Sequence, residues 1–170
     1  GIYAQDTEND AVLTTLTSTY SALGMQNKAE EIVNSALAKN PNSYGALVMM
    51  GQFASQKKDY ETAANYLSKA LEQAKDDNAR IAINASIGQC WFYKAQERVA
   101  AVKGVLSPAA RAQFNEVYNK AISYLETAKK LDTLKEQKSA WAYPLYGCYY
   151  FVKGAQAPET LAAAADAGVQ

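Results

Sequence analysis

The chain has 170 residues, in which 17 lysines and arginines are balanced by 17 aspartates and glutamates, so the formal net charge is zero. This balance argues against nucleic-acid binding, because contacts to phosphate require a basic excess or a basic stripe. The sequence contains no histidine, which excludes Ser-His-Asp and Cys-His catalysis and every zinc site that needs imidazole.

Pairs of alanines seven residues apart recur along the chain, each with a branched aliphatic residue between them. Small residues on one stripe of a helix allow two antiparallel helices to approach closely, and larger apolar residues fill the gaps. Each helix pair leaves one apolar face open, so that pairs must stack. The pattern therefore predicts an all-α repeat array. The pairs are Ala29 and Ala36, Ala63 and Ala70, and Ala121 and Ala128.

The first predicted helical hairpin covers residues 10–43. Gly24 is expected to end its first helix, and Asn40-Pro41-Asn42 its second, because glycine and proline commonly follow the last turn of a helix. Tyr3 to Asn9 align with Leu37 to Ser43, so we expect residues 1–9 to be the end of an earlier repeat in a longer array.

The next two hairpins are predicted over residues 44–77 and 81–135. From Ala63 to Ala121 is 58 residues rather than 34, and 21 of the additional residues fall between the two helices of the third hairpin. Ser107-Pro108 fits a helix N-cap followed by proline at the first helical position. We therefore predict two elongated helices, about Ala79–Lys103 and Pro108–Leu131.

The last predicted repeat, residues 139–170, departs most from the pattern. Pro144 lies within its first helix and is expected either to kink this helix or to mark a late start. Gly154 should end the helix, and Pro158 should begin a short closing helix, with a frayed tail as the alternative.

The alanine pairs of the first two hairpins are offset by 34 residues, and this period resembles the tetratricopeptide repeat. Leu47, Gly51, Ala63 and Ala70 stand at positions typical of that family. The resemblance implies one array over residues 1–170. Its fold would be a right-handed α–α superhelix of about four hairpins, the third with elongated helices.

Two features allow a chemical interpretation. Cys90 and Cys148 occupy equivalent places in adjacent repeats and are either a redox pair or nucleophilic thiols, or else buried thiols in the helix packing, which is the interpretation we favour. The adjacent carboxylates Glu30-Glu31 and Asp76-Asp77 point about 100° apart on a helix and do not converge on one point. We therefore expect no catalytic residue, no metal site and no cofactor.

The resemblance implies a concave groove, formed by the first helices of the repeats, that takes an extended peptide or a partner helix. Tyrosine is frequent at binding hot spots because it buries a large area and keeps a polar group. The alternative is that several of these aromatic residues pack in the core around the long hairpin. The candidate groove residues are Gln52, Gln89, Phe92, Tyr93, Tyr143, Tyr150 and Phe151.

These observations favour a non-catalytic scaffold that binds a protein or peptide partner. One alternative is a structural spacer or self-association module within a larger envelope protein, and another is a thiol enzyme. We expect no nucleic-acid partner and no membrane insertion, since no run of 18 apolar residues occurs. A tyrosine-rich, degenerate array of this kind resembles uncharacterised repeat proteins of bacterial envelopes, and a cytoplasmic location stays an alternative.

Overall fold

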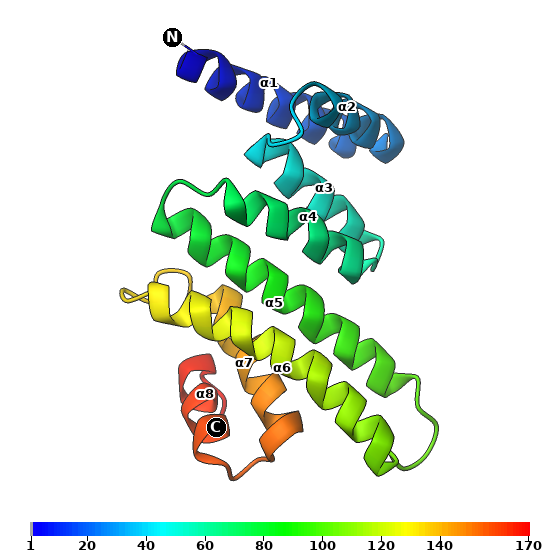
Figure 1. Ribbon diagram of the computed structural model, residues 1–170, viewed down its shortest axis with the longest axis vertical. Helices are drawn as coiled ribbons and strands as arrows, with labels where there is room; N and C mark the ends of the chain where they lie inside the picture. The colour runs from blue at the N-terminus through cyan, green and yellow to red at the C-terminus, as the bar shows by residue number, and fades with distance from the viewer. Residues whose placement is uncertain (1) are drawn as a thin grey trace. The chain divides into compact units, whose positions relative to one another are not determined.

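A computed structural model describes the backbone of residues 2–170 and the side chains of residues 10–170. Over these residues all regular secondary structure is helical (Figure 1), which confirms the all-α class. The helices are α1 (Ile2–Ala22), α2 (Gln26–Lys39), α3 (Tyr44–Gln56), α4 (Tyr60–Glu72), α5 (Asp77–Ala100), α6 (Pro108–Leu131), α7 (Lys138–Lys153) and α8 (Pro158–Ala167).

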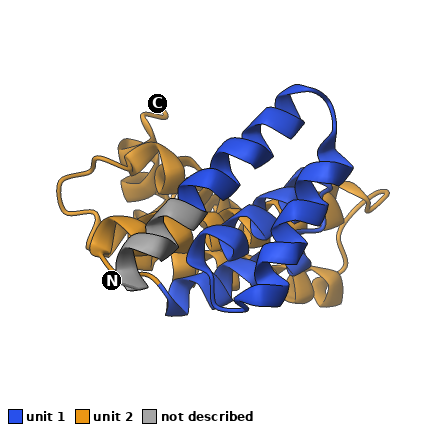
Figure 2. Ribbon diagram, turned by 90° about the horizontal axis from the view of Figure 1, so that it is seen from above, with its two compact units in different colours: residues 1–73 blue, residues 74–170 orange. Residues whose placement is uncertain are grey.

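The chain forms two compact units, residues 1–73 and 74–170, which Figure 2 colours blue and orange. The first unit holds the antiparallel hairpins α1–α2 and α3–α4, and the second holds α5–α6 and α7–α8. Each unit is therefore built from two helical hairpins, as expected for an array of helical repeats.

In residues 1–73 the small residues lie where the helices approach closely. Ala29, Ala63 and Ala70 are fully buried. A Cβ atom added to Gly51 of α3 would lie 2.8 Å from Cγ of Leu67 on α4, so the glycine is what allows this approach. The side chains of Ser43 and Asp59 cap α3 and α4 by accepting hydrogen bonds from the backbone N–H groups of Ala46 and Thr62.

Helix α1 differs from the expected boundary between residues 9 and 10. It runs without interruption from Ile2 to Ala22, so residues 2–9 continue into the first helix of the 10–43 hairpin. Residues 6–9 contain neither glycine nor proline, whereas Pro41 follows α2 in the segment with which they align. The side chains of residues 1–9 lie outside the described part of the chain, and the repeat boundaries themselves stay predictions.

The elongated third hairpin is confirmed. Helices α5 and α6 both have 24 residues, and their connection lies beyond α7 and α8 in Figure 1. The Ser107 side chain caps α6 by accepting from the Ala110 N–H at 3.1 Å, and Pro108 occupies the first helical position, as expected. Near the base of this hairpin, a Cβ atom on Gly88 would lie 2.5 Å from Cγ of Leu125.

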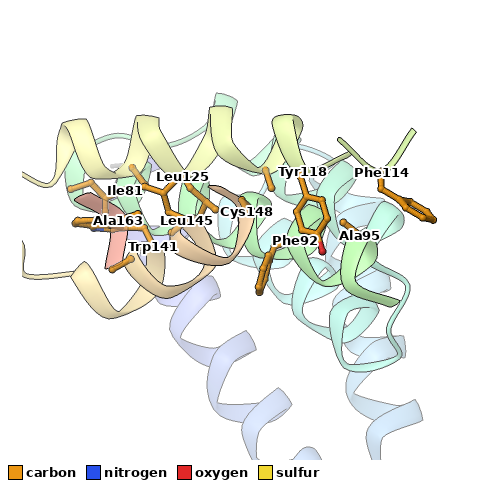
Figure 3. Packing of buried hydrophobic residues seen from close by; sticks show 14 residues of the cluster. Ile81, Phe92, Ala95, Phe114, Tyr118, Leu125, Trp141, Leu145, Cys148 and Ala163 are labelled. Carbon is orange, nitrogen blue, oxygen red and sulfur yellow. The ribbon is translucent and has the colours of Figure 1, made fainter. Parts of the chain in front are cut away.

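Helix α7 contains Pro144 and begins at Lys138, so a late start at the proline was the wrong alternative. The short closing helix α8 is present, and the Thr160 hydroxyl donates to the Gly154 carbonyl at 2.7 Å just before it. Figure 3 shows Leu125 of α6 facing Leu145 and Cys148 of α7 in the core of this unit, with Trp141 nearby. All four side chains are buried. This core fixes α7 against α6 and leaves another face of α7 for other contacts.

Candidate functional site

The predicted groove residues divide between the two units. Gln52 is exposed on α3 in residues 1–73. The other six lie on α5 and α7 in residues 74–170, and these two helices contact each other. The candidate site is therefore the α5–α7 face, whose residues all belong to one unit.

Three of the predicted tyrosines are exposed on this face. The exposed fractions are 42% for Tyr93 on α5, and 60% and 52% for Tyr143 and Tyr150 on α7. Residues three, four and seven positions apart share one face of a helix, so Tyr143 and Tyr150 lie along the same stripe. Within residues 74–170, these three side chains are the predicted residues that the structure places at the surface.

A fourth tyrosine, Tyr146, was missed by the sequence analysis. It is half-buried, and its ring centroid lies 6.3 Å from that of Tyr143 and 5.9 Å from that of Tyr150. The interplanar angles are 53° and 63°, so neighbouring rings are tilted rather than stacked. We call Tyr143, Tyr146 and Tyr150 the tyrosine row. Its signal in the sequence is the spacing of three and four residues on one helix.

Phe92 is core rather than surface, which corrects its assignment to the groove. Only 3% of the residue is exposed. A Cβ atom on Gly147 would lie 2.6 Å from Cε2 of Phe92, so the ring occupies the space that the glycine leaves on α7. The Phe92 ring also neighbours that of Tyr118 (Figure 3), and the two ring centroids are 6.4 Å apart. Phe92 therefore packs in the core between α5 and α7, beneath the exposed tyrosines.

Phe151 is half-buried between two residues of α6. Its ring stacks on that of Tyr118, with centroids 4.5 Å apart, and the Arg111 guanidinium carbon lies 5.2 Å from the Phe151 centroid. Burial raises the pKa of the Tyr118 hydroxyl to about 12, because the ionised form would lose hydration. Phe151 thus belongs to an aromatic cluster that joins α6 and α7, and Arg111 covers part of its ring.

Gln89 has a structural partner. Its Nε2 atom donates to the backbone carbonyl of Ala140 at 2.6 Å. In a regular helix this carbonyl would accept from the N–H of residue 144, but residue 144 is proline and has none. The Gln89 amide therefore supplies the hydrogen bond that Pro144 removes, and it ties α5 to α7.

The two helix segments that carry the predicted residues of the α5–α7 face contain no charged side chain. Neither residues 81–93 of α5 nor residues 139–152 of α7 include a lysine, arginine, aspartate or glutamate. The polar groups that these two segments contribute are phenol hydroxyls, amides, serine hydroxyls, indole N–H groups and thiols. A ligand of this face would be recognised by aromatic contact and neutral hydrogen bonds rather than by ion pairs.

Comparison with known protein families bears on residues 27–87. Residues 27–87, which run from α2 into α5, match the family model described as tetratricopeptide repeat. This segment of the chain is similar to tetratricopeptide repeats, in agreement with the 34-residue period of the sequence. Tetratricopeptide repeats generally mediate protein–protein interactions and serve as non-catalytic scaffolds. A comparison with curated proteins finds no match.

Both thiols of the chain, Cys90 and Cys148, are buried, and neither forms a disulfide. Burial raises the pKa of Cys148 far above its usual range because the thiolate would be poorly solvated. The thiolate is the reactive form of cysteine, so the environment of Cys148 opposes nucleophilic chemistry.

The described residues contain no group of three or more histidine, cysteine, aspartate or glutamate side chains arranged to hold a metal ion. Among the same residues, no helix is both long and apolar enough to cross a membrane.

Proposed function

We propose that this protein is a non-catalytic scaffold that binds a protein or peptide partner through the α5–α7 face. The observation that carries the proposal is the tyrosine row on α7 next to α5, which bears the exposed Tyr93, with no charged residue in residues 81–93 or 139–152. Large aromatic side chains supply most of the binding energy at many interfaces, because they remove apolar area from water and keep a hydrogen-bonding group.

The support beneath this face suits a binding surface. Phe92 fills the space over Gly147, and the Gln89 side chain bonds the Ala140 carbonyl of α7. These contacts hold the backbones of α5 and α7 in a fixed relation, so the exposed rings start from a defined arrangement. A preorganised surface loses less conformational entropy on binding.

Self-association is a second candidate, supported by a different observation. Val12, Leu16 and Leu23 are exposed large apolar residues near or on α1, and Met25 follows them at the start of the next helix. Val12 and Leu16 are four residues apart and lie on one stripe of α1. Exposed apolar side chains in such a group can mark a contact surface. Light scattering over a range of protein concentrations tests this alternative, because a dimer would raise the apparent mass.

The main proposal is tested by capture from cells of the source organism. The purified protein is compared with the triple variant Tyr93→Ala, Tyr143→Ala and Tyr150→Ala, and with the control Leu161→Ala, whose residue is exposed to 53% on α8. The proposal expects a protein retained by the wild type and the control and lost by the triple variant. Circular dichroism must show that all variants are folded. Equal retention by all three would move the binding surface elsewhere.

A further inference from the structure

The geometry of the tyrosine row restricts the shape of its ligand. Its first and last members are seven residues apart, which corresponds to a rise of about 10.5 Å at 1.5 Å per residue. The half-buried ring of Tyr146 lies between them and is tilted to both neighbours. Tilted neighbouring rings leave notches between them, whereas coplanar rings would form a flat platform. The row therefore suits a narrow, extended ligand with bulky groups at intervals.

The backbone of the ligand is restricted as well. The described residues form no β-strand, so they offer no sheet edge to pair with the N–H and C=O groups of an extended peptide. A peptide on this face must be held through side chains. A segment rich in proline meets this condition, because each proline lacks the N–H group that would otherwise need a partner.

We propose that the tyrosine row binds an uncharged, proline-rich segment of a partner in the polyproline II conformation, a ligand class that rests on the proposed function. Three residues of this conformation rise about 9.3 Å, close to the length of the row, so prolines three positions apart would lie over Tyr143 and Tyr150. The proline rings pack on the tyrosine faces, and the hydroxyls donate to the outward-facing carbonyls of the ligand.

Charge supports this class over charged peptides. The row and the facing segment of α5 contain no charged residue, so an acidic or basic peptide would gain no ion pair from these two segments and would lose part of its hydration. A polyproline II segment is also ordered before it binds, so less conformational entropy is lost. Weak, specific binding is expected from one such row.

The test is a titration of the whole chain, followed by NMR amide shifts and calorimetry. The probe is a capped oligoproline of about ten residues, long enough for three turns of the helix. The comparison ligands are a capped glycine–serine peptide of the same length and a neutral maltohexaose. Saturable shifts in residues 139–152 are expected with oligoproline, with an affinity at least about tenfold above that of the glycine–serine peptide.

Variants connect this binding to the row. Tyr143→Ala and Tyr150→Ala should each weaken oligoproline binding about fivefold or more, while Leu161→Ala should change it by less than about twofold. Tyr150→Phe keeps the ring and should retain more affinity than Tyr150→Ala. The amide spectrum of each variant reports whether it is folded.

Several outcomes would overturn the proposal. They are equal binding of oligoproline and the glycine–serine peptide, the absence of oligoproline binding at millimolar concentration, and oligoproline binding that the tyrosine variants leave unchanged. Binding of maltohexaose in place of oligoproline would identify the row as a glycan site. If oligoproline fails but a cellular partner is still lost with the tyrosines, the scaffold function stands and only the ligand class is rejected.

Discussion

The side chain of Gln89 on α5 donates a hydrogen bond, 2.6 Å long, to the carbonyl of Ala140 on α7. Because Pro144 has no N–H group, this carbonyl has no donor within its own helix, and the side chain of the neighbouring helix supplies the hydrogen bond. The amide is therefore part of the packing between the two helices that carry the tyrosines.

The first prediction follows from this repair. Gln89→Leu should lower the free energy of unfolding by about 1–3 kcal/mol, because the Ala140 carbonyl then has no protein donor. In a Pro144→Ala background the helix supplies its own N–H to this carbonyl, and the same Gln89→Leu change should cost less. Urea unfolding of the four proteins forms a double-mutant cycle. Equal costs in the two backgrounds would contradict the explanation.

The second prediction concerns the close approach of α5 and α6. Gly88→Ala would place a Cβ atom 2.5 Å from Cγ of Leu125, a fully buried residue with little room to move. We expect a loss of about 1–3 kcal/mol in stability from this overpacking, measured by thermal unfolding. Gln96→Ala is the control, since Gln96 is exposed on the same helix. A Gly88→Ala protein as stable as the wild type would mean that the two helices separate easily.

The third prediction concerns the buried Asp132, which links the end of α6 to α7. Its carboxylate accepts from Trp141 Nε1 at 2.8 Å and from the backbone N–H groups of Glu136 and Gln137 at 3.1 and 3.0 Å. Asp132→Ala leaves the buried indole N–H unpaired, and we expect a loss of about 2–3 kcal/mol together with changed tryptophan fluorescence. Glu136→Ala tests the same turn without removing the carboxylate. An Asp132→Ala variant with unchanged stability would show that these hydrogen bonds contribute nothing to the free energy of unfolding.

The fourth prediction is a dependence of stability on alkaline pH. The pKa of Tyr118 is raised to about 12, compared with about 10 for an exposed tyrosine. The folded state therefore holds this proton more tightly, and its contribution to stability is complete below pH 10 and is lost as the pH rises towards 12. The loss should be on the order of 1–2 kcal/mol for this group.

Tyr118→Phe provides the control for this measurement, because the other tyrosines of the chain also titrate in the alkaline range. Denaturation at pH 9 and pH 11.5 should show a smaller difference in stability for the variant than for the wild type. The same difference in both proteins would assign the alkaline loss to other groups.

The sequence predicted the helical hairpins well where it contains explicit local signals. Ser107-Pro108 marked the start of α6 to the residue, and Pro158 marked that of α8. The boundary after residue 9 had no such signal, since no glycine or proline accompanies it, and α1 continues through it. Local chemistry was informative wherever a helix had to begin or end.

The candidate site was harder to predict because it depends on contacts between distant residues. Phe92 was expected at the surface, and its burial is decided by the absence of a side chain at Gly147 on another helix. The role of Gln89 does have a signal in the sequence, which is Pro144 within the predicted helix. A proline inside a helix always leaves the carbonyl four residues earlier without a partner, so a nearby donor was to be expected.

The long hairpin shows how an array of this type can change length. Gly51 and Leu67 meet at the base of one hairpin and are 16 positions apart, whereas Gly88 and Leu125 make the same contact and are 37 positions apart. Of the 21 additional positions, 7 lengthen the first helix, 10 lengthen the second and 4 lengthen the connection, so the helices gain about two and about three turns at 3.6 residues per turn. When a helix is lengthened by whole turns, the small and apolar residues that face the other helix stay on the same side of it. The part of the α5–α6 hairpin beyond Gly88 and Leu125 can therefore be lengthened or shortened by whole helical turns. Engineered insertions in this part should also add whole turns to each helix.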